Sequence, residues 1–250
     1  TGARPQKAAI NSATETVLQF EYARLAKLTY GKTYNDAKAC YDGIVLSCAN
    51  LCAQKQGLNK AIAFLHGEVS ARTKYFVTTN YGSSNQWAQH NNPLPWHRVG
   101  QGSGNAGTLW GLISDSLIRL YNNACKKAHI ASPTSQLHMF VTIKAFVDDS
   151  NLSATTTNQN TVKLPKFLQT NTQLWESLLY IIGGKLEIKK CSFTMLQWVP
   201  NKDGILHIDY NHYPNLYIQS SENSKLEAIP YILPSTPYKL LGINIAADGN

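Results

Sequence analysis

Three aspartates stand where carboxylates could do chemistry together. Asp148 and Asp149 are adjacent at the end of an alternating segment, and Asp36 closes a short segment at residues 32–36. Adjacent carboxylates repel, so each raises the cost of ionising the other unless a cation intervenes. Mg²⁺ suits such oxygen ligands, and a third carboxylate would let two ions sit about 3.5–4 Å apart for an in-line phosphoryl displacement. The alternative is a polar turn at residues 148–151, because Asp, Ser and Asn are typical turn residues.

A glycine-rich segment precedes an apolar stretch that favours a helix. Residues 102–107 read Gly-Ser-Gly-Asn-Ala-Gly and match the G-x-G-x-x-G pattern of dinucleotide-binding folds. Residues 93–98, however, make a poor strand, and no acid follows about 20 residues later to hold a ribose. A P-loop is excluded because the sequence has no Gly-Lys-Ser/Thr. A dinucleotide-binding oxidoreductase therefore stays an alternative, although the strand and the acid that this fold requires around the glycines are missing.

Five short segments follow one another in the order and approximate spacing of polymerase motifs A to E. They are Asp-Ala-Lys-Ala-Cys-Tyr-Asp at 36–42, Gly-Gln-Gly-Ser-Gly-Asn at 100–105, Phe-Val-Asp-Asp at 146–149, Gly-Gly-Lys-Leu-Glu-Ile-Lys-Lys-Cys at 183–191 and Leu-Leu-Gly-Ile at 240–243. Arg4 and Pro5 before an amphipathic helix are similar to the fingers segment upstream of motif A. The set resembles the reverse transcriptase domain of eukaryotic retrotransposons, and is most similar to non-LTR (LINE-type) elements.

The resemblance implies an α+β fold, a right-hand polymerase palm with partial fingers, in which helices flank an antiparallel palm sheet. It assigns residues 1–35 to a fingers-derived helix, 36–190 to the palm with motifs A to D, and 191–250 to strands that include motif E. The implied function is RNA-directed DNA polymerase, a nucleotidyltransferase within a retrotransposon polyprotein. The chain looks truncated at both ends and short of a thumb. The alternative is thus a nucleic-acid-binding remnant with weak or no turnover.

The same resemblance implies a two-ion catalytic centre. Asp36 and Asp148 would be the main ligands of two Mg²⁺ ions, or of Mn²⁺, with Asp149 as a weaker third carboxylate. The carbonyl of Ala37 would complete one coordination shell. The implied partners are an RNA (or DNA) template, a DNA primer and dNTPs.

Further residues would contact the substrates. Tyr41 aligns with the family's aromatic steric gate against a ribose 2′-hydroxyl, and its alternative is a core tyrosine at the head of a helix. Gln101 and Gly102 would line the nascent base pair, where a residue without Cβ allows close approach. Lys190, or else Lys189, would approach the leaving pyrophosphate; the alternative is an exposed lysine. Finally, Leu241 and Gly242 would belong to the primer grip of motif E.

Periodicity and turn residues predict the elements that would position these groups. Helices are expected at residues 12–28, 41–54, 59–69, 108–127 and 166–182, and strands at 75–80, 139–147, 192–199, 205–210, 216–219 and 238–245. A break is expected at Gly31 and a turn at residues 148–151. Helices thus dominate the first half of the chain and strands the last quarter.

Composition sets the class of the protein. The chain has 250 residues, 43% of them hydrophobic, with 23 Lys and Arg against 15 Asp and Glu and a net charge of +8. This excludes general disorder and favours an anionic partner, nucleic acid ahead of a membrane surface. No apolar run approaches the ~20 residues of a membrane span. The five cysteines include no C-x-x-C pair and are expected to be reduced and buried, in an intracellular protein of the cytoplasm or nucleus.

Overall fold

The computed structural model describes residues 9–38, 41, 43–87, 106–132, 134, 136–156 and 163–249. The helices in these ranges are α1 (Ala9–Leu25), α2 (Leu46–Lys55), α3 (Lys60–Arg72), α4 (Ala106–Ala124), α5 (Lys163–Ile181) and the 3₁₀ helix η1 (Ile188–Lys190). The strands are β1 (Thr29–Asp36), β2 (Thr78–Thr79), β3 (Gly82–Ser83), β4 (Ala128–Ala131), β5 (His138–Val141), β6 (Ile143–Phe146), β7 (Asp149–Thr156), β8 (Ser192–Leu196), β9 (Trp198–Pro200), β10 (Leu206–Ile208), β11 (Leu216–Gln219), β12 (Leu226–Ile229), β13 (Tyr238–Leu240) and β14 (Ile243–Ile245).

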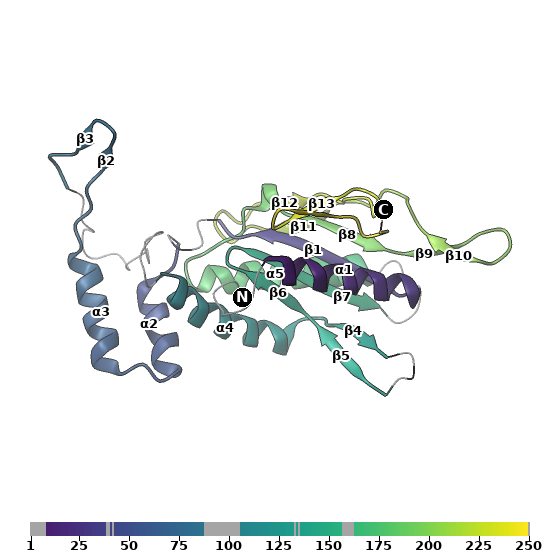
Figure 1. Cartoon of the computed structure of the whole chain (residues 1–250), viewed down its shortest axis with the longest axis horizontal. Helices are drawn as coiled ribbons and strands as arrows, with labels where there is room; N and C mark the ends of the chain where they lie inside the picture. The colour runs from purple at the N-terminus through teal and green to yellow at the C-terminus, as the bar shows by residue number, and fades with distance from the viewer. Residues whose placement is uncertain are drawn as a thin grey trace.

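A four-stranded antiparallel sheet in the order β6-β7-β1-β8 forms the centre of the molecule (Figure 1). β1 and β7 pair along their whole length, from Thr29 opposite Thr156 to Asp36 opposite Asp149. The other described strands form two-stranded antiparallel ladders. The expectation of mixed helices and antiparallel strands is therefore confirmed for the described residues.

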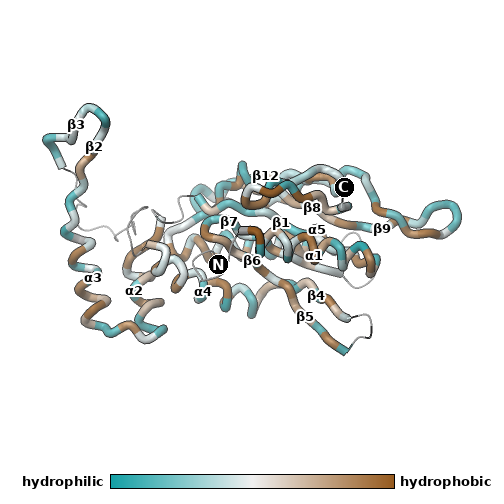
Figure 2. Tube along the Cα trace, in the orientation of Figure 1, coloured by the Kyte–Doolittle hydropathy of each residue, from teal (hydrophilic) through white to brown (hydrophobic). Residues whose placement is uncertain are grey.

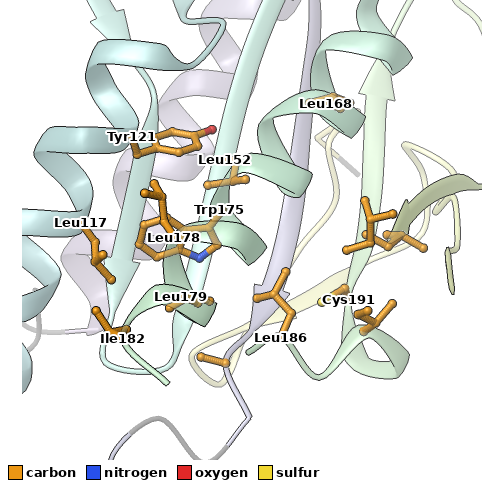
Figure 3. Packing of buried hydrophobic residues seen from close by; sticks show 14 of the residues in the cluster. Leu117, Tyr121, Leu152, Leu168, Trp175, Leu178, Leu179, Ile182, Leu186 and Cys191 are labelled. Atoms are coloured by element: carbon orange, nitrogen blue, oxygen red, sulfur yellow. The ribbon is translucent and has the colours of Figure 1, made fainter. Parts of the chain in front are cut away.

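One face of the sheet packs on α5 and α4. Leu152 of β7 is fully buried there, in a cluster built around Trp175 of α5 and Tyr121 of α4 (Figure 3). β1 approaches α5 closely, because a Cβ on Gly31 would lie 2.7 Å from a methyl carbon of Leu168. Gly31 is thus an integral part of β1, and the break predicted at this residue is wrong: the glycine provides close helix–strand packing.

The opposite face is covered by α1 and by the β13–β14 hairpin. Alternation along β1 places Tyr30, Lys32, Tyr34 and Asp36 on this face. Tyr30 packs edge-on against Phe20 of α1, with ring centroids 5.6 Å apart. The cover ends before Asp36, whose side chain is 20% exposed.

The region around the acids departs from the predicted elements. The single strand expected at 139–147 is two strands in two sheets, since β5 pairs with β4 while β6 pairs with β7. The turn expected at 148–151 is shorter, because Asp149 already begins β7. β7 was not predicted as a strand, since its residues are mostly polar. These three differences come from the pairing between strands, which local propensity does not encode.

Two parts of the chain stand away from the sheet: an arm of helices with a hairpin at its end, and a second hairpin. α3 packs beside α2 and leads to the β2–β3 hairpin, and together they form an arm that projects from the body (Figure 1). The β9–β10 hairpin projects at the other end. In the described parts of the chain, no helix is long and apolar enough to cross a membrane.

Candidate active site

The three aspartates predicted to be catalytic come together at one end of the sheet. Asp36 ends β1 directly opposite Asp149, the first residue of β7. Residues paired in this way have Cβ atoms about 4.5–5.5 Å apart and side chains on the same face. Asp148 lies in the turn beside them, and its carbonyl oxygen accepts a hydrogen bond of 3.0 Å from the amide of Ala37. Asp36 and Asp149 are half-buried, and Asp148 is exposed.

The turn that presents Asp148 has an unusual backbone. Phe146 pairs with Asp149, so Val147 and Asp148 form a two-residue loop. Val147 adopts a φ of 56°, a left-handed conformation that is rare for a β-branched residue. Its carbonyl oxygen accepts a hydrogen bond of 2.8 Å from the indole nitrogen of Trp110 in α4. The buried tryptophan therefore fixes the residue that precedes the exposed carboxylate.

Negative charge accumulates at this end of the sheet. The pKa of Asp149 is raised from 3.8 to about 6, first because burial disfavours its charged form, and then because Asp148 and Asp36 repel it. Lys190 opposes this increase. A carboxylate whose pKa is raised by burial and by two like charges occurs more often at functional sites than elsewhere, since a bound cation would reverse the penalty.

Lys190 supplies a positive charge to the cluster. Its ammonium nitrogen lies 2.8 Å from an oxygen of Asp36, and this hydrogen bond and charge attraction raise the pKa of Lys190. The lysine side chain is 69% exposed. Lys190 is thus within reach of both the acids and the solvent, and Lys189 is exposed too.

A buried carboxylate holds the segment that carries Lys190. Glu176 of α5 is fully buried, and its two oxygens accept hydrogen bonds from the amides of Leu186, at 2.7 Å, and Ser221, at 3.1 Å. Next along the segment, the amide of Glu187 donates to the carbonyl oxygen of Asp36 at 2.8 Å. These bonds tie η1 both to the helix behind the sheet and to the end of β1.

Aromatic rings flank the acids on two sides. Tyr34, two residues before Asp36, stacks on Tyr238 of β13 with centroids 3.9 Å apart. Burial, Asp149, Cys191 and Asp36 raise the pKa of Tyr238 to about 12, so its phenol stays protonated. On the other side, Tyr41 meets Trp110 edge-on at 6.3 Å and is only partly buried. Both the steric-gate and the core interpretation of Tyr41 are compatible with this position.

The donor set fits Mg²⁺ in its chemistry. Across the described parts of the chain, no three His, Cys, Asp or Glu side chains form a ready-made metal-ion cluster. The cation beside Asp36 in this structure is the Lys190 ammonium. The pKa of Asp149 is raised first by burial and then by the charges of Asp148 and Asp36, and a bound cation would offset that repulsion. Hard oxygen ligands of this kind are those that Mg²⁺ prefers.

The remaining predicted site residues lie elsewhere. Gln101 and Gly102 fall outside the described residues, as do Arg4 and Pro5. Leu241 and Gly242 form the turn between β13 and β14, with φ values of 49° and 89°. Such a two-residue hairpin turn needs left-handed backbone at both positions. The predicted primer grip is therefore a tight hairpin whose first strand supplies Tyr238 to the neighbourhood of the acids.

Three side chains around the site were not singled out from the sequence. Trp110 bonds the Val147 carbonyl next to Asp148, and Glu176 holds the segment that leads to η1. Tyr238 stacks on Tyr34, two residues before Asp36. The available signal was a polar group inside an apolar helix pattern. Glu176 interrupts the hydrophobic face of α5, and a buried acid needs hydrogen-bond donors.

Comparisons with known proteins show little. No protein-family model matches the chain, and no curated protein sequence matches it. Among solved structures, it is similar to the telomerase of Candida tropicalis in complex with a TWJ fragment of telomeric RNA, at 13% sequence identity and a TM-score of 0.47. The match covers 74% of this chain and 29% of the telomerase chain, so the chain spans less than a third of that protein.

Proposed function

We propose that the chain is the palm, with partial fingers, of an RNA-directed DNA polymerase of retrotransposon type. The observation that carries the proposal is the convergence of Asp36, Asp148 and Asp149 on a strand end and the adjoining hairpin turn. These are the acids of the segments that resemble motifs A and C, and they are far apart in sequence. Their proximity is what two-metal nucleotidyl transfer requires. Residues 36–190 and 191–250 keep their proposed roles as palm and motif E segments. Within residues 1–35, α1 keeps the role of the fingers-derived helix, whereas β1 belongs to the central sheet and therefore to the proposed palm.

In this proposal Asp36 and Asp148 would hold two Mg²⁺ ions, with Asp149 as the third carboxylate and the Ala37 carbonyl as a further ligand. When bound, the ions lower the pKa of the primer hydroxyl and neutralise the triphosphate. Asp149, with its pKa of about 6, is largely ionised at neutral pH. Lys190 leaves Asp36 to approach the departing pyrophosphate and neutralises its charge. The protein contributes positioning and electrostatics rather than covalent chemistry.

Tyr41 selects the sugar of the incoming nucleotide in this proposal. Its ring is held by Trp110, and Trp110 in turn bonds the residue before Asp148. The gate and the acids are therefore linked through one buried side chain. Replacing Tyr41 by Ala should loosen discrimination against ribonucleotides in primer extension. Unchanged discrimination would remove Tyr41 from this role.

The direct test is primer extension on a primed RNA template with dNTPs and Mg²⁺. Asp148→Asn should abolish incorporation, because it removes a metal ligand that is exposed and not needed for packing. The matched control is Asp203→Asn, which alters an exposed acid at the turn between β9 and β10. Equal activity of the Asp148→Asn protein and the wild type would refute the assigned mechanism.

Nucleic-acid binding without turnover is a second candidate. It is favoured by the Lys190–Asp36 ion pair, because the lysine neutralises the charge of Asp36 without a metal ion. In that case the protein would bind primer–template but show no Mg²⁺-dependent incorporation, and Asp148→Asn would not change binding. The dinucleotide alternative loses support, because the described ladders contain no parallel strand pair and Asp36 lies beside the turn with Asp148.

A further inference from the structure

The end of the projecting arm carries exposed aromatic rings. Phe76 is 58% exposed, Trp87 is 49% exposed, and Tyr81, at the turn of the β2–β3 hairpin, is fully exposed. Val77 between them is 68% exposed. Figure 2 shows the arm standing away from the body, with apolar and polar residues mixed along it. A single exposed ring is ordinary on a protein surface, whereas several on one short hairpin mark an interaction site.

The hairpin holds these rings on an ordered backbone. The amide of Ser84 donates to the Val77 carbonyl at 2.8 Å, and the hydroxyls of Thr78 and Ser83 bond across the strands at 3.0 Å. Gly82 closes the turn with a φ of 119°, which glycine adopts without strain. The hairpin backbone is thus pre-organised for binding, so little further backbone entropy is lost when a partner binds.

The charges around the rings are positive. Next to the hairpin, Arg72 at the end of α3 and Lys74 beyond it stand against one acid, Glu68. Glu68 is neutralised by Arg72 at 3.0 Å. The ammonium of Lys74 lies 3.8 Å from the centre of the Trp87 ring, so a cation sits directly against the aromatic surface.

We infer that this hairpin surface, formed by Lys74, Phe76, Tyr81 and Trp87, binds an unpaired nucleic-acid strand. Exposed rings stack on bases that are free of a partner, and the adjacent Lys74 supplies a positive charge for the phosphates. Duplex bases are already stacked and offer no such faces. A protein partner or a second copy of the chain would favour aliphatic contacts without the excess of positive charge. The inference does not depend on the polymerase activity, because the surface lies on the arm and uses none of the three acids.

The test is fluorescence anisotropy of the full chain with a labelled 20-nucleotide thymidine strand, a uridine strand and a duplex of equal length. Phe76→Ala with Tyr81→Ala should weaken single-strand binding about tenfold or more, from the loss of base stacking, and should leave duplex binding unchanged. Lys74→Gln should lower the slope of log affinity against log salt by about 0.7 for one lost phosphate contact. The matched control is Tyr180→Ala with Leu226→Ala, two exposed apolar side chains on the body.

Photocrosslinking of a 5-iododeoxyuridine strand should place the contact within residues 74–87. Wild-type affinity in the Phe76→Ala, Tyr81→Ala protein, or an equal loss with the duplex, would overturn the inference. So would sedimentation showing that the double variant only abolishes self-association. The Asp148→Asn protein should bind the single strand normally. If it does so while the wild type extends no primer, the proposed polymerase function fails and the binding surface stands.

Discussion

The raised pKa of Asp149 predicts that its ionisation destabilises the folded protein. The shift from 3.8 to about 6 is worth about 3 kcal/mol, which solvent screening of this half-buried side chain reduces to about 1–2 kcal/mol. The folded protein binds this proton more tightly than the unfolded chain does. The free energy of unfolding therefore falls as pH rises from about 4 to about 6, and stays lowered above that.

Asp149→Asn removes this penalty with little change in shape. In EDTA we expect the variant to be more stable than the wild type by about 1–2 kcal/mol at pH 7–8. The two proteins should converge below about pH 4, where the wild-type carboxyl is protonated. Urea unfolding followed by tryptophan fluorescence between pH 4 and 8 measures the difference.

The control is Asp203→Asn, whose exposed carboxylate lies far along the chain in the β9–β10 turn. Its unfolding free energy should follow the wild type at every pH. A variant Asp149→Asn that is no more stable than wild type at pH 8, or a gain that does not change with pH, would refute the electrostatic reasoning. We expect Asp149→Asn to lose primer extension while it gains stability. The proposed function needs three carboxylates close together, and their mutual repulsion lowers the stability of the folded protein.

Three further substitutions test how the site is supported. Lys32→Met should stabilise the protein by about 1–2 kcal/mol at pH 7: burial lowers the pKa of Lys32, so the gain should shrink toward pH 10.5, measured by urea unfolding. Trp110→Phe removes the donor to the Val147 carbonyl and should cost about 1–3 kcal/mol and slow primer extension; normal extension would mean that this bond does not position Asp148. Gly31→Ala places a carbon 2.7 Å from Leu168 and should lower the unfolding free energy by about 1–3 kcal/mol.

The acids were predictable from sequence because the signal is local in each motif. Asp148 and Asp149 follow an alternating segment and Asp36 closes a short one, and the order of the five motif-like segments singles out these three acids. Helices were also predictable, since α4 and α5 carry strong apolar faces. Their catalytic and metal-binding roles stay predictions until the Asp148→Asn experiment is done.

β7 escaped prediction because most of its buried side chains are polar. Ser153 is 1% exposed, yet its hydroxyl bonds that of Tyr30 at 2.8 Å. Thr155 accepts from the amide of His129 at 2.9 Å. A strand whose polar groups find partners across the sheet is buried without being hydrophobic, so hydropathy cannot identify it. The register that brings Asp149 opposite Asp36 depends on this strand.

The supports of the site escaped prediction for a different reason. Trp110 lies 37 residues from Val147 in the chain, and Glu176 lies 10 residues from Leu186 and 45 residues from Ser221. Nothing in the local sequence of either side chain indicates which groups it bonds. Their roles appear only when α4 and α5 are packed on the sheet. Sequence patterns thus identify the reactive side chains more readily than the distant residues that position them.

The backbone around the acids is fixed independently of their side chains. Beyond the end of β1, the amide of Ala37 donates to Asp148 at 3.0 Å and the amide of Lys38 to Lys185 at 2.8 Å, while Glu187 donates to Asp36 at 2.8 Å. The segment is therefore held from both sides by main-chain bonds. A carboxylate can be replaced by its amide without releasing this frame, so loss of activity in such a variant would report on charge and coordination rather than on unfolding.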